Sequence, residues 1–136
     1  MTETLSLVLF SGTDDKLTAA ATMATGAAAM GTRVKVFLQF WALDAFRSDR
    51  IDKDHGVAHE AGPEGAAALR RMAEKGGPHW GELLRQAKDI GEVEIEACAH
   101  SMEMLEIGRD DLDPLVSDVI GIAAFMAGVD GPVVFI

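Results

Sequence analysis

Short apolar runs alternate with longer segments of helical period along this chain. The first run, residues 5–10, predicts a buried strand, and residues 11–13 predict the turn that ends it. An alanine-rich segment at residues 14–30 predicts a helix, with Gly31 as its C-terminal stop. Residues 34–40 predict a second strand. Because the second half of that strand is apolar on both faces, we expect it inside a parallel sheet.

The rest of the chain continues this alternation. In chain order, we expect a short helix at residues 41–46, a long mobile loop at 47–63, helices at 63–74 and 80–90, a strand at 93–97, a helix that Cys98 opens, a short strand at 116–119, a helix at 122–127 and a strand at 132–136.

This order of elements predicts a three-layer α/β fold with a mostly parallel sheet of about five strands flanked by helices. The chain has 136 residues, 49% of them hydrophobic, and this composition favours one compact domain over residues 1–136. Ligands of such sheets gather at the carboxyl ends of the strands. We expect residues 11–13, residues 40–43 and Cys98 at that edge.

The charge of the chain excludes several classes of function. The formal net charge is −10, with 22 acidic and 12 basic residues and no basic cluster, so we expect neither nucleic acid nor an anionic membrane surface as a partner. The longest uncharged run, residues 17–32, is shorter than the roughly 20 apolar residues of a membrane span. Thr2 and Glu3 replace the basic start of a secretory signal. We therefore expect a cytoplasmic protein.

Cys98 is the only cysteine, so it cannot form an intramolecular disulfide. Its place between a predicted strand and a predicted helix favours a reactive thiolate, because amide groups that open a helix stabilise negative charge. Glu96 and Glu103 act against a second negative charge nearby, and His100 could offset them. The alternative for a free cysteine is a buried and inert side chain.

Other arrangements in the sequence carry weaker signals. His55 and His59 are four residues apart, but Gly56 interrupts them and the segment is polar loop, so we expect no metal site. No glycine pattern of a nucleophile elbow surrounds Cys98, which argues against a hydrolase. Ser11, Gly12 and Thr13 are ordinary helix-capping residues that could also hold a small anion. We expect no cofactor.

Several segments together resemble the DsrE/DsrF-like family of sulfur-relay proteins. The matching segments are residues 10–16, 27–31, 36–43, 97–104, 122–125 and 134–136. The resemblance covers nearly the whole chain except residues 47–90, and its most specific part is Ala-Cys-x-x-Ser-Met at residues 97–102. One departure is Glu106, at a position where the family often has glycine.

The resemblance implies a small α/β domain that assembles into oligomers and carries sulfane sulfur as a persulfide. Cys98 occupies the position of the carrier cysteine, and His100 and Ser101 are candidates to tune or position it. The implied partner is a TusA-like sulfur carrier or a rhodanese-type donor or acceptor. The chain would be a sulfurtransferase-like carrier in sulfur trafficking or oxidation.

Residues near the expected strand ends could complete a pocket for this chemistry. Phe40, Trp41 and Met102 could form an apolar collar that slows loss of the persulfide to water, next to the turn that contains Ser11, Gly12 and Thr13. Two alternatives stay open. One is a non-catalytic oligomeric subunit that binds a ligand or a partner and has a structural Cys98. The other is a thiol redox sensor in which Cys98 forms a sulfenic acid.

Overall fold

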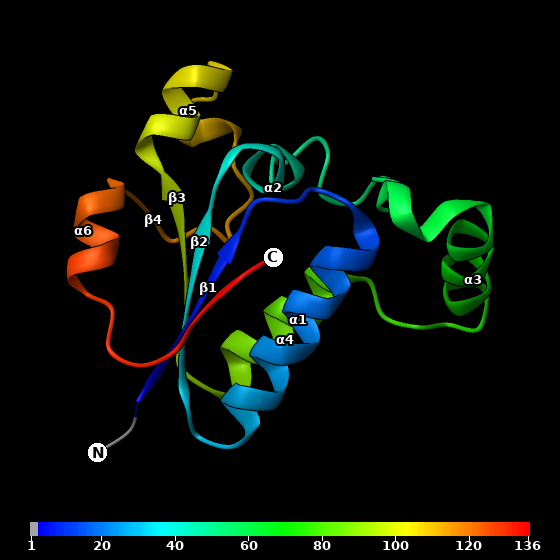
Figure 1. The fold of residues 1–136 in the computed structure, drawn as a ribbon, viewed down its shortest axis with the longest axis horizontal. Helices are drawn as coiled ribbons and strands as arrows, with labels where there is room; N and C mark the ends of the chain where they lie inside the picture. Colours follow the sequence, from blue (N-terminus) through cyan, green and yellow to red (C-terminus); the bar gives the residue numbers. More distant parts are fainter. Residues whose placement is uncertain (1–2) are drawn as a thin grey trace.

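A computed structural model describes residues 3–136 of the chain. Five strands form one sheet, all neighbouring pairs are parallel, and the order is β4-β3-β2-β1-β5. Their bounds are β1 Thr4–Leu9, β2 Arg33–Leu38, β3 Val93–Cys98, β4 Asp118–Ile120 and β5 Val133–Phe135. Helices lie on both faces of this sheet (Figure 1), which confirms the predicted three-layer α/β fold.

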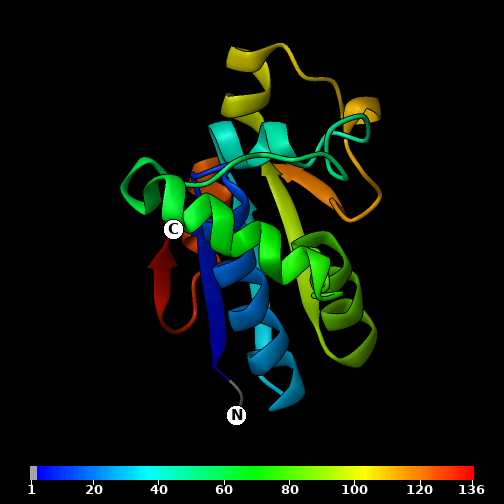
Figure 2. The same cartoon turned by 90° about the vertical axis from the view of Figure 1, so that its right-hand side faces the viewer.

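The helices are distributed unequally around the sheet. Helices α1 (Asp14–Ala29) and α4 (Trp80–Ile90) cover one face, and α6 (Ile122–Ala127) lies on the other (Figures 1 and 2). Helices α2 (Phe40–Ala45) and α5 (Ala99–Leu105) stand at the carboxyl edge. Helix α3 (Gly62–Glu74) projects away from the sheet, and none of its residues is buried. Two short 3₁₀ turns are η1 (His59–Ala61) and η2 (Arg109–Asp111).

Most element boundaries lie within two residues of the predicted ones. The second strand, predicted at residues 34–40, ends at Leu38, and Phe40 already belongs to α2. Gly31 has a φ of +81°, the left-handed conformation that ends α1 as predicted. The fourth strand, predicted at residues 116–119, is wrong by two residues at its start. The N–H of Val116 closes a turn onto the carbonyl of Asp113, and Ser117 donates to the carbonyl of Ile95 before the strand begins.

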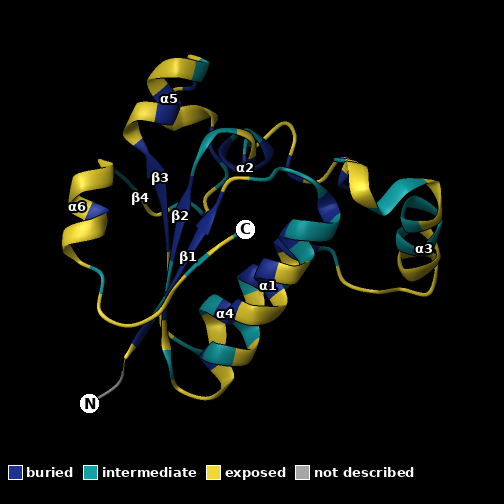
Figure 3. Cartoon of the chain, viewed as in Figure 1, coloured by how far each residue is buried: buried dark blue, intermediate teal, exposed yellow. Residues whose placement is uncertain are grey.

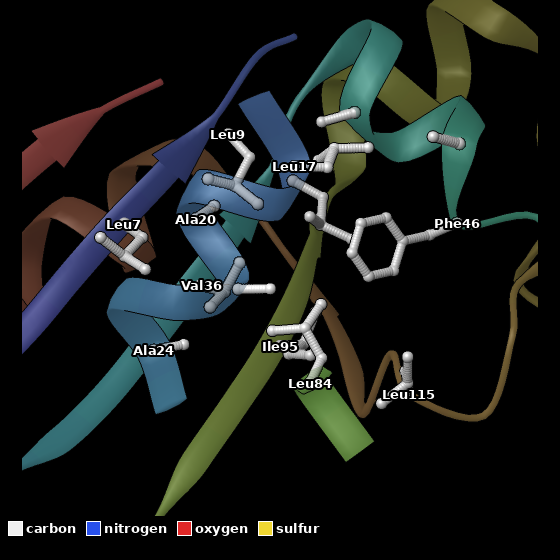
Figure 4. Close-up of a cluster of buried hydrophobic side chains, with 14 of the residues drawn as sticks. Leu7, Leu9, Leu17, Ala20, Ala24, Val36, Phe46, Leu84, Ile95 and Leu115 are labelled. Carbon is white, nitrogen blue, oxygen red and sulfur yellow. The ribbon is translucent and has the colours of Figure 1, made fainter. Parts of the chain in front are cut away.

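The main core lies between the sheet and the pair α1 and α4. Alternate residues of the strands point into it, among them Leu7, Leu9, Val36 and Ile95 (Figure 4). Small residues on α1 let this helix approach the sheet closely, and they are Ala20, Ala21, Ala24 and Ala28. The same alternation sends every second strand residue to the opposite face, so the coverage of that face decides what those residues meet.

The opposite face has a much smaller core. It consists of Val8, Phe37 and Cys98 from three neighbouring strands and Phe125 from α6. Helix α6 is otherwise exposed, with one short buried part (Figure 3). Among residues 3–136, no helix has the length and apolar character needed to cross a membrane.

Candidate functional site

Cys98 lies where β3 passes into α5, as the sequence predicts. It is the last residue of the strand and the N-cap residue of the helix. The backbone N–H of Ser101 donates a hydrogen bond to Cys98 Sγ over 3.4 Å. The sulfur therefore occupies the position that a serine or aspartate oxygen takes in an ordinary helix cap. This N–H, at the start of a helix of only seven residues, supplies the hydrogen bond that the thiol accepts.

The thiol is buried within the chain. Cys98 is 2% exposed and belongs to the small core of the opposite face. Its partners there are Val8, Phe37 and Phe125, with Ile120 and Val129 partly buried against them. A sulfur in these surroundings is shielded from water by apolar side chains on the sheet side and by α6 on the other side.

Phe125 is the residue that closes this small core. Its side chain is 1% exposed and stacks on Phe37, with ring centroids 4.5 Å apart and ring planes at 18°. Phe125 is the only buried residue of α6. Access to Cys98 from the α6 side therefore depends on where this single ring lies.

The two predicted neighbours of Cys98 have opposite environments. Ser101 is 0% exposed, and its Oγ has no hydrogen-bond partner among the described residues. His100 is exposed, and its ring meets Phe40 edge-on with centroids 6.5 Å apart. Ser101 thus contacts the thiol through its backbone N–H and has a buried hydroxyl, while His100 belongs to the outer surface of the carboxyl edge.

Aromatic rings form a row along the carboxyl edge. Phe40 lies 5.8 Å from Phe10 and 6.2 Å from Trp41, and Phe10 lies 5.9 Å from Phe135, measured between centroids. Phe40 has a φ of +41°, a left-handed conformation that is strained for a side chain of this size. The row therefore depends on a backbone conformation that the first turn of α2 imposes.

A hollow of about 320 Å³ opens beside this row. Its lining residues are Ser11, Gly12, Thr13, Trp41, Asp44, Ala45, Arg50 and His55. The structure thus brings together four of the six predicted pocket residues. Phe40 joins them through its ring contact with Trp41, whereas Met102 packs in the main core. Cys98 is not among the lining residues, so the hollow and the thiol are separate features of the same edge.

Several polar groups around the hollow are paired inside the protein, whereas the buried Nε2 of His55 has no hydrogen-bond partner among the described residues. Ser11 and Thr13 share a hydrogen bond of 3.0 Å, and Arg50 contacts Asp44 over 3.2 Å. Asp15 accepts from the N–H of Ala58 at the start of α1. Burial raises the pKa of Asp15, but hydrogen bonds from Thr13 and Ala58 outweigh it and hold this pKa below its ordinary value.

A buried carboxyl group shares the face of Cys98. Glu96 lies two residues earlier on β3, is 8% exposed, and has Oε1 3.8 Å from Lys35 Nζ. Burial raises the pKa of Glu96, Lys35 opposes this, and the charges of Glu94 and Asp118 add to it. Glu103, the other acidic neighbour in the sequence, is exposed to water.

The sequence interpretation missed the role of Asp14. This buried carboxylate accepts the indole N–H of Trp80 over 2.9 Å and the backbone N–H of His55 over 2.8 Å. It therefore fastens α4 and the segment after α2 to the start of α1. The available signal was Trp80, because a buried indole needs an acceptor and acidic residues are common at helix starts.

Comparisons with known proteins show what this chain is similar to. It is 29% identical to the uncharacterized protein YrkE of Bacillus subtilis (strain 168) over 148 residues, which cover 93% of this chain and 91% of YrkE. Its fold matches that of MTH1491, a protein of unknown function from Methanobacterium thermoautotrophicum. The TM-score is 0.60 and the identity 14%, over 98% of this chain and 99% of that one.

The family comparison concerns the first part of the chain. Residues 1–63, which run from the N-terminus to the start of α3, match the DsrE/DsrF/DrsH-like family. Cys98 lies beyond the matched segment, so its role is a separate question. The match confirms, for this part of the chain, the resemblance to the DsrE/DsrF-like family that the sequence predicts.

Proposed function

We propose that this chain is a sulfur carrier that holds sulfane sulfur as a persulfide on Cys98 and passes it to a partner thiol. The match of residues 1–63 to the DsrE/DsrF/DrsH-like family supports a function related to sulfur relay. The position of Cys98 is the observation that supports the more specific proposal of a persulfide carrier. The only thiol of the chain stands at the carboxyl edge of the sheet, where it accepts one backbone N–H.

The chemistry is sulfur exchange without net oxidation or reduction. The Cys98 thiolate attacks the outer sulfur of a donor persulfide, a new S–S bond forms at Cys98, and the donor leaves as its thiolate. In the second step an acceptor thiolate attacks the outer sulfur on Cys98. The bond to Cys98 Sγ breaks, and the Cys98 thiolate is regenerated.

A second protein must take part in both steps. The chain has no other cysteine that could attack the persulfide, so an internal disulfide cannot release the sulfur. The proposed partner is a TusA-like carrier or a rhodanese-type protein. We place this exchange in the cytoplasm. Residues 1–136 would form one domain that assembles into a homo-oligomer.

Ser101 and His100 have distinct roles in this proposal. Ser101 contributes its backbone N–H to Cys98 Sγ and has a free buried hydroxyl that could donate to the outer sulfur of a persulfide. His100, on the exposed side of α5, could contact an incoming partner. Both act as positioning residues.

Burial of the thiol favours a second candidate function. At 2% exposure inside an apolar cluster, Cys98 could be a packing residue of a subunit that binds a ligand or a partner by another surface. The two candidates differ in one property, which is whether the folded chain gains sulfur at Cys98.

Intact mass after incubation with polysulfide tests this property. The carrier function predicts a gain of one sulfur atom that reductant removes and that Cys98→Ser abolishes. A folded chain that gains no sulfur and resists alkylation supports the packing role. Gain of oxygen alone under mild peroxide supports a redox sensor. Cys98→Ser is a suitable control because serine also accepts the N–H of Ser101.

A further inference from the structure

Helix α6 is attached to the rest of the protein in an unusual way. Every hydrogen bond of residues 122–129 joins two residues of residues 121–129, for example Phe125 N–H to the carbonyl of Gly121 and Val129 N–H to that of Met126. Among residues 3–136, none reaches the sheet or another helix from this segment. Side-chain packing alone therefore holds α6 on the sheet.

That packing depends on a single ring. Phe125 is the only buried residue of α6, while Ile122 is 44% exposed and Met126 53% exposed. Figure 3 shows the same contrast between α6 and the buried strands beneath it. If Phe125 leaves its place against Phe37, no other buried side chain of α6 keeps the helix in position.

The two ends of the segment are firmly fixed. Ile120 pairs with Cys98 in the sheet, and the carbonyl of Asp130 accepts the N–H of Thr4. Between them, α6 begins after Gly121 and ends before Gly128. The space around a side chain at Gly121 is empty. This segment has fixed ends, glycine at both helix boundaries, one buried side chain (Phe125) and one partly buried side chain (Val129), so it can open locally while the sheet stays intact.

We propose that residues 121–129 form a gate over Cys98, with Phe125 as its latch. In the closed state seen here, the Phe125 ring and α6 shield the thiol, and a local opening of this segment admits the reagent or partner thiol. The purpose of the gate rests on the proposed carrier function. The opening itself does not, because alkylation of the thiol measures it without any sulfur transfer.

The test measures the rate at which Cys98 of the folded chain reacts with iodoacetamide. The rate is measured at urea concentrations from zero to the start of global unfolding. A local opening predicts a rate that hardly changes over this range. Phe125→Ala should raise the rate about tenfold or more, because burial of the ring keeps the gate shut. Gly121→Ser should lower the alkylation rate by about two- to fivefold. Serine can cap α6 in the closed state, and it reduces the number of backbone conformations open to the segment when it detaches.

Phe46→Ala is the matched control. Phe46 is a fully buried ring of the main core that contacts Trp80, so its loss weakens the whole protein without touching α6. The gate predicts little change in the alkylation rate of Phe46→Ala at zero urea. If Phe125→Ala does not fold, Phe125→Leu should give a smaller acceleration of the same kind.

Three results overturn the gate. These are a rate that climbs steeply with urea from zero, equal acceleration in Phe125→Ala and Phe46→Ala, and no acceleration in Phe125→Ala. The outcome also separates the two proposals. A chain that opens but never gains sulfur keeps the gate and loses the carrier function. A chain that gains sulfur at Cys98, but whose alkylation rate is not changed by Phe125→Ala, keeps the carrier function and loses the gate.

Discussion

The ring of Phe125 stacks on the ring of Phe37 with centroids 4.5 Å apart, and this contact joins α6 to the sheet within the buried cluster that contains Cys98. One helix of six residues thus forms a whole layer of the fold on this side. The stability of that layer and the shielding of the thiol depend on the same pair of side chains.

This contact predicts a measurable coupling between the two rings. Phe37→Leu and Phe125→Leu each remove the stack but keep an apolar side chain. In a double-mutant cycle, we expect a coupling of about 0.5–1.5 kcal/mol in the free energy of unfolding. Urea unfolding of the four proteins measures it. Fully additive losses would mean that the stacked arrangement contributes nothing beyond buried area.

The buried carboxyl of Glu96 predicts an unusual pH dependence. Its pKa is raised by burial, so the folded state holds the proton more tightly than the unfolded state does, and stability falls as pH rises from the ordinary glutamate pKa through the raised value. We expect Glu96→Gln to be more stable than the wild type at neutral pH by about 1 kcal/mol. The difference should disappear in acid, where both side chains are neutral.

Glu94→Gln is the control for this effect. Glu94 lies on the same strand and the same face but is exposed. Its substitution should change the pH profile of urea unfolding much less than Glu96→Gln does, and toward a lower Glu96 pKa, because the charge of Glu94 adds to that shift. A Glu96→Gln protein that is less stable at neutral pH would show that the contact with Lys35 outweighs the burial of the charge.

The end of α5 predicts a stabilising substitution. Glu106 has a φ of 55° and a ψ of 43°, a left-handed conformation that costs a residue with a side chain about 1 kcal/mol relative to glycine. Glu106→Gly should therefore raise the melting temperature. Glu103→Gly, inside α5, should lower it, since glycine weakens a helix interior by about 1 kcal/mol. Equal effects of the two changes would contradict this account of the helix end.

The two hydrogen bonds of Asp14 predict a specific loss of stability. In Asp14→Asn, one oxygen can still accept, but the amide nitrogen faces either the Trp80 indole N–H or the His55 backbone N–H. A buried donor without a partner costs about 2 kcal/mol. Urea unfolding followed by tryptophan fluorescence tests this, with Asp52→Asn, at an exposed position, as the control. Equal stability of Asp14→Asn and the wild type would rule out this anchoring role.

The sequence pattern predicted the fold well because the signals for it are local. The apolar runs of β1 and β2, the alanine periodicity of α1 and the left-handed stop at Gly31 each depend on a few neighbouring residues. The strand-to-helix position of Cys98 belongs to the same class of signal, and it is confirmed.

The surroundings of Cys98 could not be predicted because they are made by distant segments. The alternation along β3 places Cys98 on the same face as Glu94 and Glu96. Two glutamates on one face predict that this face is exposed to solvent, and they give no sign that it is covered. Phe125, which covers that face, comes from a helix after the next strand. In the same way, no local pattern links Asp14 to Trp80, and helical spacing does not show that Met102 turns to the main core.

Transfer of sulfur in a single turnover tests the central claim most directly. The chain is loaded with sulfane sulfur, freed of excess donor, and mixed with a reduced TusA-like carrier, and the masses of both proteins are followed in time. The carrier function predicts that one sulfur atom leaves Cys98 and appears on the acceptor thiol, with no transfer from Cys98→Ser. A loaded chain that keeps its sulfur in the presence of acceptor thiols, or a chain that never loads, would contradict it.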